Sequence, residues 1–374
     1  MSIGDRLKRI GIAELPLHAG KCPPWLFSRM KRLAKVITEV IVYEYGKEEF
    51  LRRLSDPFFF QALSCVLGYD WHSSGTTTVT MGALKEALKP EELGIAVCGG
   101  KGRVSRRAPS EIGKVAELFS LSTSKMEGLQ YASRIAAKVD NSCLQDGYQL
   151  YHHCFVLAED GNWAVVQQGM SGRLARRYHW LSSAIKKFVE EPHSGICGDR
   201  WEEAVLDMTA KESDEARKTS LDLVKDNPKH LAKYVLSVEQ RTLDEYLERS
   251  PWVLKLTMSP QHRISDLTER TMASLQRAYE IQPDNYEELV AIRGVGPKTV
   301  RALALISDLI YGKPPSWKDP AKYSFAHGGK DGIPFPVDKP TYQRTTEILD
   351  SAIEGAKIEQ KDKINAIRRL HEFL

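Results

Sequence analysis

The sequence predicts an α+β protein, with a mixed α/β domain over residues 1–200 and an all-α domain over residues 201–374. Apolar residues at helical spacing alternate with strand-like runs up to about residue 200, whereas the following segments are nearly all helical in pattern. Asp160-Gly161 stands between two alternating apolar runs, which is a strong signal for a β-hairpin. The motif GVGPKT separates two helical segments within residues 285–311, which indicates a helix-hairpin-helix motif in the second domain.

The first domain is expected to combine helices with at least three strands. Ser55 or Asp56 is a suitable N-cap before Pro57, which fits the first turn of a helix. Helices are expected at 25–45, 47–55, 57–67, 82–89 and 110–118, and strands at 93–98, 147–157 and 162–168.

The expected β-hairpin fixes which polar side chains share a face of the sheet. A two-residue Asp160-Gly161 turn would pair Phe155 with Val166 and His153 with Gln168, and would place His152 on the opposite face from His153. Buried histidines and glutamines in strands rich in Val and Phe need hydrogen-bond partners or a metal. A shift of one residue in the turn would reverse the assignment of faces.

The second domain is expected to be helical on both sides of the hairpin motif. An ordered loop with the sequence SFAHGGKDGIPFPVDKP should precede the last two helices, of which the final one is amphipathic. The expected helices lie at 201–248, 262–282, 340–355 and 356–374, with the helix-hairpin-helix motif at 285–311.

The hairpin motif is typical of proteins that bind DNA. Two glycines around one apolar residue let the backbone turn tightly, so that amides at the start of the second helix can meet a phosphate. Pro297 suits the first turn of that helix. Such clamps hold the sugar-phosphate backbone without reading bases. The expected DNA contacts are Gly294, Val295, Gly296, Lys298 and Thr299, and the expected apolar anchors are Leu289, Ile292, Val295, Val300, Leu303 and Ile306.

The net charge and the cysteine content limit which kinds of protein this chain can be. A net charge of +4 is too small for bulk attraction to nucleic acid, so clustered basic residues would have to act locally. Six dispersed cysteines without a CxxC pair argue against a zinc ribbon and a disulfide framework. The chain shows neither a signal peptide nor a membrane span, which predicts a soluble, cytoplasmic protein. Basic clusters occur at Arg6, Lys8 and Arg9, at Lys101, Arg103, Arg106 and Arg107, and at Arg173, Arg176 and Arg177.

Histidines and carboxylates in the first domain suggest metal-assisted hydrolysis. Divalent ions polarise a phosphodiester and lower the pKa of bound water, and mixed Asp, Glu and His ligands suit Mn²⁺ or Mg²⁺, with Zn²⁺ as the alternative. Each histidine taken singly is better explained as a hydrogen-bonded core residue, whereas the group as a whole supports a metal site and a polar core equally. The expected metal ligands are His18, Asp70, His72, Asp140, Asp146, His153, His179 and His193, and the expected catalytic residues are Asp70, His72, Asp146, His153 and Glu191.

Further basic residues are expected to contact DNA. Lys101, Arg103 and Arg177 are candidates to hold the scissile phosphate. Lys330 lies in FAHGGKDG, whose glycines would form a phosphate-binding nest or simply a structural loop. The order of this segment does not match an ATP-binding loop.

Nearly the whole sequence resembles the prokaryotic domain-of-unknown-function family 763. The matching blocks include LSDPFFFQALSCVLGYDWHSSGTTT, CGGKGRVSR, SRIAAKVDNSCLQDGYQLYHHCFV and SFAHGGKDGIPFPV. The resemblance implies a shared fold and a role in handling DNA, with nuclease activity as the expected reaction. It also favours His153 over His152, because the family pattern does not fix the latter position.

Residues 285–345 also resemble the DNA glycosylases of the helix-hairpin-helix superfamily. That resemblance places Lys298 at the Schiff-base lysine and Asp338 at the catalytic aspartate of those enzymes. The segment between Gly296 and Asp338 is longer than in the glycosylases, and Lys339-Pro340 replaces their Thr-His.

Three functional hypotheses follow from the sequence. The first is a divalent-metal-dependent DNA nuclease acting in repair or processing of DNA. The second is a glycosylase or abasic-site lyase that uses Lys298 and Asp338, and the third is a DNA-binding module without catalysis. The preferred DNA structure and the oligomeric state, with a homodimer as one option, stay open at this stage.

Overall fold

A computed structural model describes residues 22–69, 75–172, 174–198, 201–228, 230, 269–321, 323–324 and 339–373. Its centre is a six-stranded sheet with the order β1-β3-β4-β5-β6-β8, in which only the β6–β8 pair is parallel. The fold is therefore of the α+β class. The strands are β1 (Ile95–Lys101), β3 (Gln149–Ala158), β4 (Trp163–Ser171), β5 (Leu174–Leu181), β6 (His193–Gly198) and β8 (Tyr323–Ser324), and β2 (Leu144–Gln145) pairs separately with β7 (Leu206–Asp207).

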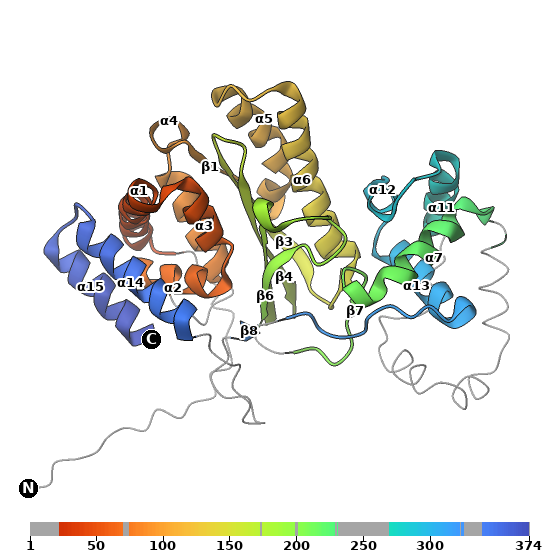
Figure 1. The fold of residues 1–374 in the computed structure, drawn as a ribbon. Coiled ribbons are helices and arrows are strands. Elements are labelled where there is room, and N and C mark those ends of the chain that lie inside the picture. Colours follow the sequence, from red (N-terminus) through yellow and green to blue (C-terminus); the bar gives the residue numbers. More distant parts are fainter. Residues whose placement is uncertain are drawn as a thin grey trace, which may run out of the picture.

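One face of the sheet is covered by helices from both ends of the chain (Figure 1). Val97, Val156 and Val166 point from the sheet into this core, and Leu349 and Leu370 enter it from the last two helices. The helices are α1 (Pro24–Leu54), α2 (Pro57–Leu67), α3 (Gly75–Ala87), α14 (Lys339–Gly355) and α15 (Gln360–Phe373), and α4 (Pro90–Leu93) is a short helix before β1.

The other face of the sheet packs against helices from the middle of the chain (Figure 1). Phe155, Trp163 and Trp180 supply the aromatic part of this second core. All six apolar anchors expected around the hairpin motif are buried in it. The elements are η1 (Gly102–Arg107), α5 (Ala108–Leu118), α6 (Thr123–Ser142), α7 (Asp214–Lys225), α11 (Glu269–Ile281), α12 (Tyr286–Ala291) and α13 (Pro297–Tyr311).

Local signals explain several element boundaries. The break between the expected helices 25–45 and 47–55 is confirmed, because Gly46 lies inside α1 with a φ of 86°. Asp56 caps α2 by accepting a hydrogen bond from the Phe58 amide, at 2.8 Å. α14 and α15 pack against α1 and α2, so the chain beyond residue 338 shares a core with residues that the expected boundary near 200 assigned to the other domain.

The register expected for the β-hairpin is wrong by one residue. Phe155 pairs with Val165 and His153 pairs with Gln167. The loop holds three residues between Ala158 and Asn162, and Gly161 adopts a φ of 83° within it. A three-residue loop with glycine in the left-handed region shifts the pairing relative to a two-residue turn. His153 and Gln167 therefore share one face, and His152 and Gln168 share the other.

No helix in the described parts of the chain is both long and apolar enough to cross a membrane.

Candidate functional site

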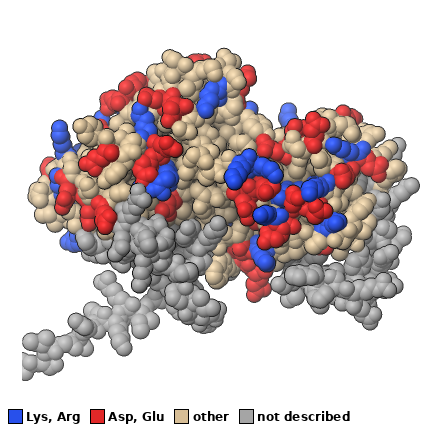
Figure 2. Space-filling view, in the orientation of Figure 1, with Lys and Arg blue, Asp and Glu red and all other residues tan. Residues whose placement is uncertain are grey.

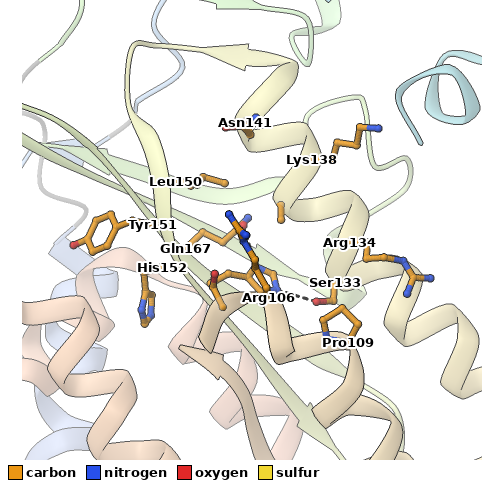
Figure 3. A pocket seen from close by; sticks show the side chains of 13 residues that line it. Arg106, Pro109, Ser133, Arg134, Lys138, Asn141, Leu150, Tyr151, His152 and Gln167 are labelled. Atoms are coloured by element: carbon orange, nitrogen blue, oxygen red, sulfur yellow. Dashed lines mark hydrogen bonds between the residues drawn. The ribbon is translucent and has the colours of Figure 1, made fainter. Parts of the chain in front are cut away.

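A cavity of about 460 Å³ lies between η1, α6 and the first residues of β3 (Figure 3). Its lining combines basic side chains, hydroxyl groups and two imidazoles. The lining residues are Ser105, Arg106, Pro109, Ser133, Arg134, Ala137, Lys138, Asn141, Leu150, Tyr151, His152, His153 and Gln167.

The lining carries three basic residues and no aspartate or glutamate. Arg106 and Arg134 are exposed, and in Figure 3 Arg134 and Lys138 project from α6 at one side of the cavity. The surface over α7 differs from this cavity in its charges. Basic and acidic side chains are intermingled there (Figure 2), as in the Lys218–Asp214 pair at 2.8 Å. A cavity whose charged lining has a single sign favours an anionic ligand.

The cavity floor is the end of a buried chain of hydrogen bonds. Ser133 Oγ lies 2.9 Å from His153 Nε2, and His153 Nδ1 lies 2.9 Å from Gln167 Oε1. The Gln167 side-chain amide donates to Asp140 Oδ2 at 2.5 Å, and Trp180 Nε1 donates to the same oxygen at 3.0 Å. His193 contacts the other oxygen, Oδ1, of Asp140. The network joins α6 to four strands of the sheet, β3, β4, β5 and β6.

The carboxylate of Asp140 determines the proton positions along this network. An ionised carboxylate only accepts hydrogen bonds, so Gln167 must turn its NH₂ group toward Asp140 and its oxygen toward His153. His153 Nδ1 then carries the ring proton, which leaves Nε2 as an acceptor. Burial lowers the pKa of His153 and so favours this neutral form. The hydroxyl of Ser133 consequently donates its proton to His153 Nε2.

The cavity adjoins the α12–α13 turn. Lys138, which lines the cavity, donates from Nζ to the carbonyl oxygen of Ile292 at 2.5 Å. Burial lowers the pKa of Lys138. The same helix, α6, holds α12 through the Tyr131 hydroxyl, which donates to Glu287 at 2.8 Å. Lys138 therefore links the lining of the cavity to the C-terminal end of α12.

The turn between α12 and α13 contains two glycines in different backbone conformations. Gly294 has a φ of 102°, which only glycine adopts easily, and Val295 is buried beneath it. Gly296 has an ordinary φ of −133°, and an added Cβ would meet its nearest atom only at 3.9 Å. The N-cap of α13 is Gly296, which has no side chain to cap the helix, and the first turn contains exposed Lys298 and buried Thr299.

The described metal candidates are divided among three environments. Asp140, His153 and His193 meet in the network below the cavity, whereas His179 lies on the other face of the sheet. Asp146 Oδ2 accepts from the Tyr178 hydroxyl at 2.7 Å and from Arg176 at 3.3 Å. Burial raises the pKa of Asp146 to about 6, against the lowering effect of Arg176. Glu191 is exposed, with a φ of 43°.

The contacts of these residues leave little capacity for a metal ion. Asp140 already accepts three hydrogen bonds, and both ring nitrogens of His179 are engaged, Nδ1 with the Leu54 carbonyl at 3.1 Å and Nε2 with Arg177 at 2.9 Å. Within the described ranges, no three His, Cys, Asp or Glu residues gather in a metal-binding group. The described set as it stands does not fit a divalent ion. His18, Asp70, His72, Lys330 and Asp338 lie outside the described residues.

The basic residues expected to contact phosphate also lie in different places. Arg177 is buried on the face opposite the network, where its guanidinium lies 4.4 Å from the Phe60 ring and donates to Gln61 at 3.2 Å. Arg176 is fully buried against Asp319, so neither Arg176 nor Arg177 belongs to a solvated face. Lys101 and Arg103 are exposed, and Lys101 Nζ lies 5.8 Å from the ring of Tyr151, which lines the cavity.

Sequence reasoning missed four residues of the cavity. Ser133, Arg134 and Lys138 lie on α6, a helix that was not predicted, and Arg106 had been noted only as part of a basic cluster. A usable signal was present, because Ser133 and Asp140 stand seven residues apart and therefore face the same side of a helix.

Comparison with known proteins gives one result for this chain. A family model described as "Protein of unknown function (DUF763)" matches residues 11–337. Neither the curated proteins nor the solved structures contain a significant match.

Proposed function

The chain belongs to the DUF763 family of proteins of unknown function, and for this member we propose a DNA-binding nuclease that hydrolyses phosphodiester bonds in repair or processing of DNA. The observation that carries the proposal is the cavity with basic lining and no acidic lining, placed over a hydrogen-bonded Ser133–His153 pair. Phosphodiesters are the anions that would meet a basic cavity and a nearby backbone turn along one strand.

The two parts of the surface would have separate roles. The turn at Gly294–Gly296 and Lys298 would hold one phosphate of the strand through backbone amides and a point charge. Arg106 and Arg134 would draw a neighbouring phosphate to the cavity. Neither contact reads a base, so binding would depend on the backbone of DNA and would weaken steeply with salt. Lys138 supports this arrangement because it touches both parts.

Metal dependence is a separate element of the proposal. Mn²⁺ or Mg²⁺, with Zn²⁺ as the alternative, is expected from the sequence and would polarise the phosphodiester. The described residues do not fit such an ion in their present contacts, so no step is assigned to it. Chelation by EDTA tests this element directly.

The decisive experiment compares cleavage and binding of labelled single-stranded, duplex, flap and abasic DNA, with Mn²⁺, Mg²⁺ or EDTA, and with a borohydride trap. We expect EDTA-sensitive cleavage of undamaged DNA. The double substitution Arg106→Ala and Arg134→Ala should reduce cleavage about tenfold or more, whereas Lys357→Ala, an exposed lysine between α14 and α15, should leave it unchanged.

Two other outcomes would replace the proposal. Nicking only at abasic sites, resistant to EDTA and trapped by borohydride, would make Lys298 the Schiff-base nucleophile of a lyase. Binding without any cleavage would establish the non-catalytic module, in which the polar network serves only the core. Absence of both binding and cleavage would refute all three DNA hypotheses.

A further inference from the structure

We propose that Ser133 is the nucleophile of this site and forms a covalent phosphodiester with the cleaved strand, with His153 as its base. The identity of the substrate, DNA, rests on the proposed function, whereas the choice of Ser133 as the nucleophile rests on its geometry at the cavity. The sequence had offered His153 as a metal ligand or catalytic residue and had given Ser133 no role.

The bonding of Ser133 differs from that of two other buried helical serines, Ser64 and Ser220. Ser64 Oγ donates to the carbonyl of Phe60 at 2.9 Å, and Ser220 Oγ donates to that of Ala216 at 2.7 Å. This bond to the preceding turn is the usual way in which a helical serine satisfies its hydroxyl. Ser133 instead directs its hydroxyl to an imidazole, at the wall of a cavity.

The network prepares His153 for that hydroxyl. Asp140 orients Gln167, Gln167 accepts the Nδ1 proton, and Nε2 is left to take a proton from Ser133. A nucleophile, a base within hydrogen-bond reach and a third group that orients the base are the parts of an activated serine. Trp180 and His193 hold Asp140 in turn. Two hydrogen-bonded residues, His153 and Gln167, thus lie between Ser133, a buried residue that lines the cavity, and the innermost carboxylate.

The charges around the cavity suit the same reaction. Arg106 and Ser133 line the same cavity, and Arg134 follows Ser133 directly on α6. Both guanidinium groups are free of acidic partners in the described part of the chain. They can therefore balance the charge that develops on the non-bridging oxygens of an attacked phosphodiester.

The step is balanced with water as the only other reactant. Ser133 Oγ forms a bond to phosphorus while its proton passes to His153 Nε2, and the bond between phosphorus and the leaving oxygen breaks. That oxygen receives the proton from Nε2 and departs as a hydroxyl end of the strand. Water then attacks phosphorus, gives a proton to Nε2, and Ser133 Oγ leaves and recovers a proton. The products are one hydroxyl end and one phosphate end.

A fluorophosphonate probe tests the nucleophile without DNA, using the full-length protein. Attack by Ser133 would displace fluoride and leave a phosphonyl ester at residue 133, which peptide mass spectrometry locates. We expect labelling in the wild type and in Ser142→Ala, a buried serine on the same helix. Ser133→Ala should not label, and His153→Gln should label about 100-fold more slowly because its base is removed.

A second variant separates reactivity from folding. Ser133→Cys should unfold at the temperature of the wild type and should be alkylated at residue 133 by iodoacetamide. Residue 133 lines the cavity, whereas none of the six native cysteines is among the lining residues. Failure of folded wild-type protein to label at Ser133, or equal labelling rates in the wild type and His153→Gln, would overturn the assignment.

Denaturing gels of the DNA reaction distinguish this inference from the proposed function. An SDS-resistant adduct between protein and labelled DNA, absent in Ser133→Ala, supports both. Cleavage by Ser133→Ala at the wild-type rate, without an adduct, overturns the nucleophile and leaves the nuclease. Probe labelling at Ser133 without cleavage of any DNA supports the nucleophile and rejects DNA as its substrate.

Discussion

At the scale of single residues, Asp140 organises more of the site than any side chain that faces the cavity. It is fully buried and accepts hydrogen bonds from Gln167, Trp180 and His193. Loss of one member of a buried charged network leaves other polar groups without partners. The orientation of the Gln167 amide, and with it the acceptor role of His153 Nε2, depends on this carboxylate.

We therefore expect Asp140→Asn to lower the free energy of unfolding by about 2–4 kcal/mol, as measured by urea denaturation. The substituted NH₂ group would face donors, so Gln167 would lose its fixed orientation and labelling of Ser133 would slow. Asp222→Asn, at an exposed position of α7, is the matched control and should change neither quantity. Unchanged stability in Asp140→Asn would show that the network is not cooperative.

His152 is the opposite case, because neither of its ring nitrogens has a hydrogen-bond partner in the described part of the protein although the residue is 1% exposed. Replacement by leucine removes two buried polar atoms at similar volume. We expect His152→Leu to raise the free energy of unfolding at pH 7 by about 1–2 kcal/mol. Calorimetry would measure the gain, and a loss of stability would mean that the imidazole has a partner that this arrangement lacks.

The types of residue in the site could be predicted from the sequence, but their arrangement in space could not. Histidines and glutamines in an apolar hairpin indicated buried polar groups that need partners, and Asp140, His153 and His193 meet in one hydrogen-bonded network. The sequence could not show that Asp146 is engaged by Tyr178 and Arg176, or that His179 lies on the opposite face of the sheet, because both depend on strand register and on pairing with β5. A single residue in the turn after Ala158 was enough to exchange Gln168 for Gln167.

At the scale of elements, the two glycines of the α12–α13 turn differ in whether the fold requires a glycine at that position. An added Cβ at Gly294 would lie 2.8 Å from Ser274 Oγ and would require a φ of 102°, whereas Gly296 has room and an ordinary backbone. The fold thus explains Gly294 and leaves Gly296 unexplained. A backbone that must be reached by a phosphate would explain it.

We expect Gly294→Ala to lower the free energy of unfolding by about 1–3 kcal/mol, and Gly296→Ala to change it by less than about 0.5 kcal/mol. If the backbone at Gly296 meets DNA, the second substitution should weaken binding about tenfold, as measured by fluorescence anisotropy. Gly128→Ala, on the open side of α6, serves as control. Wild-type affinity in Gly296→Ala would remove the turn from the interface.

At the scale of the whole molecule, the sheet separates two cores that the chain enters from different parts of its length. Helical periodicity identified α14 in advance, but periodicity does not state which surface a helix covers. Leu349 and Ile353 fill the core beside α1 and α2, far from the preceding helices in the sequence. Long-range packing of this kind depends on complementary surfaces, and a single sequence shows only one side of each contact.

The two cores also hold three histidines that burial keeps neutral. Burial lowers the pKa of His152 to about 3 and lowers those of His153 and His179. Because the unfolded chain would bind a proton at each near pH 6.5, their contribution to stability is present above that pH and is lost as the pH falls below it. Burial raises the pKa of Asp146 to about 6, so this carboxyl opposes one histidine between about pH 6 and 4.

The free energy of unfolding should therefore fall on acidification below about pH 6.5, by up to about 1.4 kcal/mol per pH unit for each buried histidine. Urea denaturation at pH 7.5, 6.5, 5.5 and 4.5 would measure the slope. His152→Leu should reduce it by the contribution of one proton, because the unfolded variant has one fewer site to protonate. His230→Gln, at an exposed position, should keep the wild-type slope. A stability that is constant from pH 7.5 to 4.5 would show that these imidazoles are hydrated in the native protein, and the proton assignment that leaves His153 Nε2 free to accept from Ser133 would fall with it.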